Sequence, residues 1–275
     1  MNIDRRIIFV IVALAVAIPL VVPLDLPVAV TDETRAVYDR LEMLDSGSVV
    51  LVSFDHEASS LPEVRPLAEA IVNHCFMRKA RVIGLALFAE GTAVGYDILN
   101  DIAAQQGKVY GHDYVYLGYR PQYTAAILGM GESIREVFPT DYDETPWEEI
   151  PLLQGVHNYD DIDLVISVAD GSLPTYWVEY AQARYGQEVI AVLTAVMVTA
   201  YTPYVDAGQI SGILGGLKGA AEYEKLIDRP AAGKRGMDAQ ALTHLAIAVM
   251  IVVGNVIAFG ARRKKKTAVA GEHAV

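Results

Sequence analysis

The sequence contains one cysteine and no Asn-x-Ser/Thr acceptor for N-linked glycans. A single thiol, Cys75, excludes a disulfide within the chain, so the fold must be stabilised by other means. The residues around Cys75 predict a buried helix face, where a free cysteine packs as a small apolar side chain. Both absences fit a bacterial or archaeal membrane better than a eukaryotic secretory surface.

The chain also lacks the short motifs that identify common enzymes. It contains no Gly-x-x-x-x-Gly-Lys-Ser/Thr phosphate loop and no Gly-x-Ser-x-Gly nucleophile elbow. The segment 129–134 lacks the third glycine of a dinucleotide loop and falls inside a predicted helix. The six histidines have no zinc-ligand spacing, and the acidic stretch from Asp141 lacks the glycine that a calcium loop needs at its sixth position. The sequence therefore predicts neither a metal nor a cofactor.

Basic residues are scarce in the central part of the chain. Between Asp25 and Ala241 lie 32 of the 34 acidic residues but only 15 of the 22 basic residues. Affinity for nucleic acid depends on lysine and arginine at the phosphates, so this charge balance excludes nucleic acid as a partner. It also disfavours flat binding to anionic lipid. An acidic surface suits cations or basic partners, although solubility alone accounts for it.

Two long segments without any charge lie near the ends of the chain, at 7–24 and 242–261. About twenty apolar residues, rising 1.5 Å each, cross a hydrocarbon core of about 30 Å. A cleaved signal peptide is the alternative for the first segment, but its small-x-small sites, between Ala13 and Ala17, lie inside the apolar run. The sequence thus predicts two transmembrane helices, the first ending near Pro19 and Pro23.

Basic residues flank both segments on their terminal sides. The N-terminal part, 1–6, contains Arg5 and Arg6, and the C-terminal tail, 262–275, begins with five basic residues. Because positive charge stays on the cytoplasmic side, both termini are predicted to be cytoplasmic. The main domain, 25–227, would then be extracytoplasmic and joined to the second anchor by a Pro- and Gly-containing linker, 228–241. A prokaryotic plasma membrane is the expected location.

Asn255 lies deep in the second apolar segment, where an unpaired amide is costly. One interpretation is a hydrogen bond to another helix, either the first anchor or a second copy of the chain. The other is that Asn255 lies near the inner interface and meets water.

Between the two anchors, strand-like and helix-like stretches alternate. The segment 49–54 is apolar on both faces, which predicts a strand covered on both sides. The further predicted strands are 82–88, 114–117, 163–168 and 189–199. The predicted helices are 31–44, 62–79, 93–106, 123–137, 176–185 and 209–227. This alternation predicts an α/β fold, a Rossmann-like or flavodoxin-like three-layer sandwich with a mostly parallel five-stranded sheet and right-handed crossovers.

Polar side chains follow several of the predicted strands. Ligands of open α/β sheets bind beyond the carboxyl ends of the strands, so these side chains are candidate binding residues. They are Asp55, His56, Glu57, Glu90, Arg120, Asp170 and Tyr204. Such a rim suits a sugar, a peptide or a cation. The same residue types also cap helices and fill loops, which is the structural alternative.

The last predicted helix, 209–227, contains four glycines within eight residues: Gly212, Gly215, Gly216 and Gly219. Each glycine costs a helix up to about 1 kcal/mol relative to alanine. Spacings of four residues would give a smooth face that the sheet, another subunit or a membrane helix can approach closely. Alternatively, Gly215 and Gly216 break the helix into a loop that contacts a ligand.

Two functions are compatible with these features. The first is a binding or scaffold subunit of a membrane assembly, with the lipid bilayer, further copies or other membrane subunits as partners and a small molecule at the strand ends. The second is a membrane-anchored hydrolase that uses Asp55, Glu90 or Asp170 as acid and base. The missing catalytic motifs favour the first.

Overall fold

The structure is a computed structural model that describes residues 5–22, 24 and 26–272. The chain divides into two compact units. An α/β unit comprises Val28–Lys234, and a second unit comprises the terminal segments, Met1–Pro27 and Arg235–Val275.

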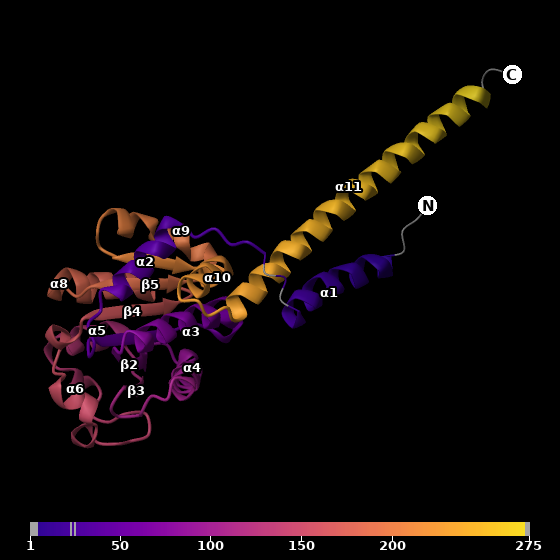
Figure 1. The fold of residues 1–275 in the computed structure, drawn as a ribbon. Helices are drawn as coiled ribbons and strands as arrows, with labels where there is room; N and C mark the ends of the chain where they lie inside the picture. The colour runs from indigo at the N-terminus through magenta and orange to yellow at the C-terminus, as the bar shows by residue number, and fades with distance from the viewer. Residues whose placement is uncertain (1–4, 23, 25, 273–275) are drawn as a thin grey trace. The chain divides into compact units, whose positions relative to one another are not determined.

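Six parallel strands form the sheet of the α/β unit (Figure 1). They are β1 (Val49–Asp55), β2 (Arg81–Ala86), β3 (Tyr114–Tyr119), β4 (Leu164–Ala169), β5 (Val189–Leu193) and β6 (Gly212–Gly215). The strand order is β3-β2-β1-β4-β5-β6, which is the order of Rossmann-type sheets and not of flavodoxin-type sheets. The direction of winding reverses between β1 and β4, so the topological switch point lies there.

Helices cover both faces of the sheet, as the sequence predicts. On one face, Val50 and Val52 of β1 pack beneath α2, α3, α4 and α10. These helices are α2 (Asp32–Glu42), α3 (Leu61–Met77), α4 (Gly91–Gln105) and α10 (Gly216–Leu226). On the other face, Val49 and Leu51 pack beneath α5 (Tyr123–Glu132), α6 (Ile134–Val137), α7 (Leu173–Trp177) and α9 (Ala195–Asp206). All seven residues of β1 are buried because each face of the strand is covered.

Short helices fill the connections. A 3-10 helix, η1 (Ala58–Ser60), precedes α3, and three more follow α6: η2 (Trp147–Glu149), η3 (Pro151–Gly155) and η4 (Tyr159–Asp161). The helix predicted at 176–185 consists of the end of α7, a π-helical stretch, η5 (Val178–Gln182), and α8 (Ala183–Tyr185).

Two predictions near the end of the α/β unit are wrong. The strand predicted at 189–199 ends at Leu193, and the rest of that segment belongs to α9. The helix predicted at 209–227 is divided into β6 and α10. Pairing with β5 makes Gly212–Gly215 a sixth, edge strand, so the predicted sheet was one strand short. Local propensity does not reveal a four-residue strand that exists only through its neighbour.

The four glycines of this region lie in β6 and the start of α10, where neighbouring side chains pack tightly on them. A Cβ at Gly212 would lie 2.7 Å from Val37 Cγ2 of α2, and one at Gly215 would overlap Val198 of α9. Gly219 is less confined. Small residues are required because α2 and α9 both pack onto β6. Whether these glycines also contact another subunit stays a prediction.

The terminal unit contains α1 (Arg5–Val21) and all but the first three residues of α11 (Ala232–Glu272). Within the described part of the chain, Ala232–Gly260 is the one helical segment long and apolar enough to cross a membrane, and α1 is a shorter apolar helix. The segment 228–241, predicted as a linker, is helical from Ala232 onward. Asn255 lies on α11 and is exposed.

Gly216 tests the break between β6 and α10. Its φ is 63°, and an added Cβ would lie 2.8 Å from the Cβ of Ala195. We expect Gly216→Ala to destabilise the α/β unit by roughly 2 kcal/mol or more, through backbone strain and overpacking. The matched control is Gly155→Ala, where an added Cβ meets nothing within 4 Å and φ is not positive. Urea denaturation of both variants provides the measurement, and equal stability would contradict the strained turn.

Candidate functional site

The carboxyl ends of β1 and β4 define the first candidate site. Asp55, the last residue of β1, pairs with Ala169 of β4. The loop that follows, 56–60, contains no glycine and leads through η1 into α3. In dinucleotide-binding sheets, glycines in this loop let the backbone approach a pyrophosphate. The loop after β1 therefore lacks the local structure that such a ligand requires.

Asp55 is a buried carboxyl group, with 2% of its surface exposed. Its Oδ1 accepts a hydrogen bond from the Leu87 backbone N–H at 2.6 Å, and its Oδ2 accepts one from the Ser53 hydroxyl at 2.5 Å. Burial raises the pKa of Asp55 to about 6, because the loss of hydration outweighs the hydrogen bonds that favour the carboxylate. The side chain thus ties the end of β1 to the chain just after β2 from inside the core.

His56 follows Asp55 and is fully buried. Its Nδ1 lies 3.4 Å from the Glu57 carbonyl oxygen, and its Nε2 has no hydrogen-bond partner among the described residues. Burial lowers the pKa of His56, so the ring is neutral near pH 7. In this position the imidazole does not reach the solvent.

The remaining carboxylates near β1 act as caps for neighbouring loops. Asp170 Oδ2 accepts a hydrogen bond from the Glu57 backbone N–H at 2.8 Å, across the switch point. Glu90 Oε2 accepts one from the Ala58 backbone N–H at 3.2 Å. The structure therefore brings Asp55, Glu57, Glu90 and Asp170 together around one loop, but it uses three of these carboxylates to satisfy backbone groups.

The two other predicted site residues lie elsewhere. Arg120 follows β3, two strands away from β1, and its guanidinium lies 4.9 Å from the centre of the Phe138 ring. Tyr204 lies within α9, where its ring packs 5.6 Å from that of Tyr201. Tyr204 was predicted at a strand end, and the prediction is wrong because α9 begins before it.

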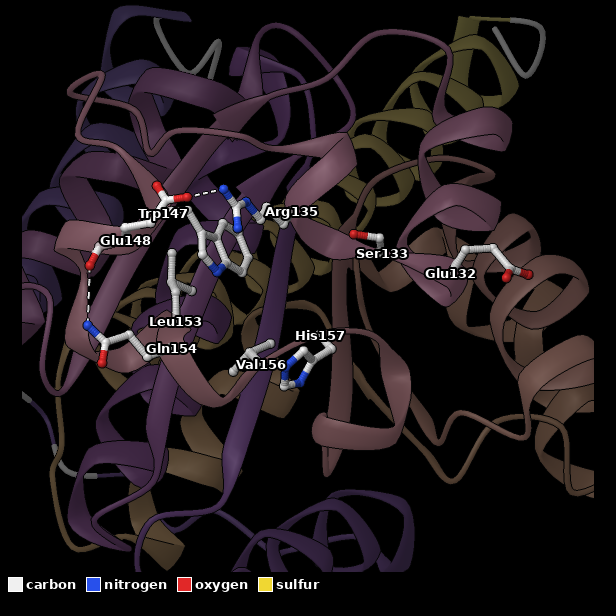
Figure 2. A pocket seen from close by; sticks show the side chains of 9 residues that line it. All are labelled: Glu132, Ser133, Arg135, Trp147, Glu148, Leu153, Gln154, Val156 and His157. Carbon is white, nitrogen blue, oxygen red and sulfur yellow. Dashed lines mark hydrogen bonds and ion pairs between the residues drawn. The ribbon is translucent and has the colours of Figure 1, made fainter.

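A hollow of about 570 Å³ lies away from the strand ends, between α5, α6 and the short helices (Figure 2). It is lined by Glu132, Ser133, Arg135, Trp147, Glu148, Leu153, Gln154, Val156 and His157. Its volume falls in the range of small-molecule sites. Sequence reasoning missed this hollow, because short 3-10 helices have no periodic pattern that would place their side chains.

Several polar side chains around the hollow already have partners. Arg135 forms an ion pair with Glu148, and the Gln154 amide donates to the Glu148 carbonyl oxygen at 3.2 Å (Figure 2). His157 Nδ1 lies 3.0 Å from Asp161 Oδ2. The apolar side chains beneath, Trp147 among them, are almost fully buried. The hollow thus offers a surface with both polar and apolar side chains. In the described part of the chain no cluster of His, Cys, Asp and Glu side chains is arranged to hold a metal ion.

A second buried polar cluster joins α2, α3 and α10. His74 Nε2 lies 2.7 Å from Glu42 Oε1, and its Nδ1 lies 2.7 Å from the Tyr223 hydroxyl. Burial lowers the pKa of His74, so a neutral ring donates to Glu42 and accepts from Tyr223. Both nitrogens are satisfied, and the cluster locks three helices together.

No protein-family model and no curated protein matches the sequence. Among solved structures, the chain is similar to the C-terminal domain of a glycosyl transferase group 1 family protein, LpcC, from Francisella tularensis, with 13% identity, coverage of 79% and 92% of the two chains, and a TM-score of 0.36. A trehalose-6-phosphate synthase, OtsA, gives 13% identity, 86% and 45% coverage, and a TM-score of 0.32. For a sugar ABC transport substrate-binding protein from Bordetella parapertussis, the identity is 12%, the coverage is 70% of this chain and 86% of that one, and the TM-score is 0.19. The strand order, and not these distant likenesses, defines the fold.

Asp55 predicts a pH dependence of stability. Because its folded-state pKa is about 6 against a reference value of 3.8, the folded protein binds this proton more tightly than the unfolded chain does. The contribution of Asp55 to the free energy of unfolding is therefore full below about pH 4 and is lost as the pH rises through about 6. The loss is on the order of 3 kcal/mol.

Asp55→Asn removes the titration but keeps a similar shape. We expect the difference in unfolding free energy between the native protein and this variant to fall between pH 4 and pH 7, measured by urea denaturation at each pH. Taking the difference cancels the contributions of other groups. A constant difference over that range would contradict the raised pKa.

Proposed function

We propose that this protein is a membrane-anchored binding or scaffold subunit, whose acidic α/β unit lies on the extracytoplasmic face of a prokaryotic cell membrane. The observation that carries the proposal is the apolar segment Ala232–Gly260 of α11. Large apolar side chains are exposed along it, namely Leu245, Ile251, Val252, Val256 and Phe259. Exposed apolar surface of this extent is stable in lipid and costly in water.

Further support comes from α10, which holds both ends of the α/β unit. Glu222 Oε2 accepts hydrogen bonds from the backbone N–H and the hydroxyl of Thr31, at 2.9 and 2.6 Å. Glu224 accepts three from the backbone N–H groups of Ala231, Gly233 and Lys234, at 2.8, 2.7 and 2.9 Å. Glu222 and Glu224 therefore hold the two ends of the α/β unit in place at the points where the chain continues toward α1 and α11.

The proposal includes α1 as a second anchor. Its 17 residues extend about 25 Å, at the short end of the range for a membrane-spanning helix. Arg5 and Arg6 precede its apolar part, and the basic residues 262–266 follow that of α11. By the positive-inside rule both termini would then lie in the cytoplasm.

A membrane-anchored hydrolase is the second candidate, because a carboxyl group with a pKa of about 6, as in Asp55, suits general acid–base catalysis. Its burial opposes this function, since both oxygens of Asp55 accept hydrogen bonds from the protein itself. Glu90 and Asp170 likewise accept from backbone groups. These contacts support structural roles for the carboxylates, and with them the binding or scaffold function.

Cysteine labelling tests the proposed topology. Cys75 is first replaced by alanine, and single cysteines are introduced as Asp143→Cys, on the exposed surface of the α/β unit, and Thr267→Cys, in the basic tail. In intact cells, we expect a membrane-impermeant thiol reagent to modify position 143 and not position 267. Permeabilised cells, in which both positions react, are the control. Labelling of position 267 alone in intact cells would mean that the tail is outside the cell and the α/β unit is in the cytoplasm. Labelling of neither position would also place the α/β unit in the cytoplasm.

A further inference from the structure

The hollow of about 570 Å³ between α5, α6 and the short helices combines an apolar floor with a polar rim (Figure 2). Trp147, Leu153 and Val156 form the floor, and all three are almost fully buried. Glu132 and Glu148 stand on the rim and are exposed. A concave surface of this volume and composition is typical of sites that bind a ligand with both apolar and polar parts.

Acidic side chains predominate around this hollow. Those that line it or adjoin a lining residue are Glu132, Glu136, Glu148, Glu149 and Asp161, and the basic ones are Arg135 and, beside the Tyr185 ring, Arg184. Five negative charges against two positive ones leave three negative, with histidine counted as neutral. The segment 138–163, which supplies six of the nine lining residues, contains no lysine or arginine. The hollow therefore attracts a cationic occupant and repels an anionic one.

The rim offers hydrogen-bond acceptors to such an occupant. Glu148 already accepts the guanidinium of Arg135, but 57% of each side chain is exposed, so this pair is weak and open to exchange. Glu132 Oε1 accepts from the Tyr185 hydroxyl at 3.0 Å, and a carboxylate has room for further donors. Because the Gln154 amide nitrogen donates to the Glu148 carbonyl oxygen, the Gln154 side-chain oxygen is an acceptor as well. The N–H groups of arginine and lysine match this rim.

We propose that the hollow is a docking site for a basic segment of a partner protein, with arginine or lysine side chains at the rim carboxylates and an apolar side chain against the floor of Trp147, Leu153 and Val156. This site supplies a partner class for the binding or scaffold function proposed above and rests on that proposal. The chain's own basic residues, 262–266, are not the occupant, because the proposed topology places them across the membrane from the α/β unit. The negative charge around the hollow also opposes an anionic lipid surface.

Peptide binding to the full chain in phosphatidylcholine nanodiscs tests the proposal, because this lipid carries no net charge. The probe is a fluorescein-labelled peptide of alternating arginine and leucine, and fluorescence anisotropy reports its binding. We expect saturable binding that weakens at least about tenfold when the salt concentration rises from about 50 to about 300 mM, since salt screens exposed charges. The control peptide, with glutamate in place of arginine, should not bind.

Removal of the rim charges should weaken binding of the arginine–leucine peptide. We expect Glu132→Gln combined with Glu148→Gln to raise its dissociation constant about fivefold or more, because each site loses a charge-assisted hydrogen bond. The matched control is Asp39→Asn combined with Asp45→Asn, which takes the same charge from exposed residues on and just after α2, a helix that covers the opposite face of the sheet. This control should change the dissociation constant by less than about twofold.

Removal of Arg135 should have the opposite effect, since its guanidinium competes with the peptide for Glu148. We expect Arg135→Gln to lower the dissociation constant about twofold or more, and Arg35→Gln, which removes the same charge from α2, to leave it nearly unchanged. All the substituted side chains are exposed, so the fold is retained in these variants, and circular dichroism checks this.

Three results would overturn the docking site while leaving the anchoring in place. They are no saturable binding of the arginine–leucine peptide, equal binding of the glutamate peptide, and rim variants whose dissociation constants match those of their controls on α2. Recovery of the chain with the nanodiscs separates the two proposals, since a chain that does not co-purify with them contradicts the anchoring and the docking site together.

Discussion

The contact between Glu224 and the first turn of α11 is the constraint on which the proposed architecture depends. Glu224 is 2% exposed, and its carboxylate accepts hydrogen bonds from three backbone N–H groups that would otherwise have no partner at a helix start. Burial raises the pKa of Glu224, but these three donors favour the ionised form. Replacing the side chain would leave these donors without their carboxylate partner at the end of the α/β unit, where α11 begins.

Other carboxylates in the α/β unit also accept hydrogen bonds from backbone N–H groups, which accounts for part of its high content of acidic residues. Asp163 accepts from the Val49 N–H at the start of β1, Asp55 accepts from Leu87 near the other end, and Asp170 bridges the switch point to Glu57. Each carboxylate satisfies a backbone group where two segments meet. The acidic residues at these strand ends are thus accounted for by the backbone groups that they satisfy.

Much of the fold could be predicted from the sequence, because β1 to β5 and the helices between them have clear apolar patterns. β6 could not, since its four residues become a strand only by pairing with β5, and α9 was mistaken for a continuation of β5 because it is equally apolar. The rule for strand ends selected Asp55, Glu57, Glu90 and Asp170, and their role in binding stays a prediction. Burial and hydrogen bonding, which tie three of these carboxylates to backbone groups, have no sequence signal. Tyr204 was predicted at a strand end because α9 was predicted to be part of β5. The hollow beside Trp147 was missed because short helices and loops line it, and these have no periodic sequence pattern.

Membrane anchoring is the central claim, and fractionation of cells that produce the full chain tests it most directly. An integral protein held by Ala232–Gly260 should stay in the membrane pellet after washing at high salt and at alkaline pH, and should be released by detergent. Release by the alkaline wash alone, or recovery in the soluble fraction, would contradict the account, because α11 would then be covered by protein and not by lipid.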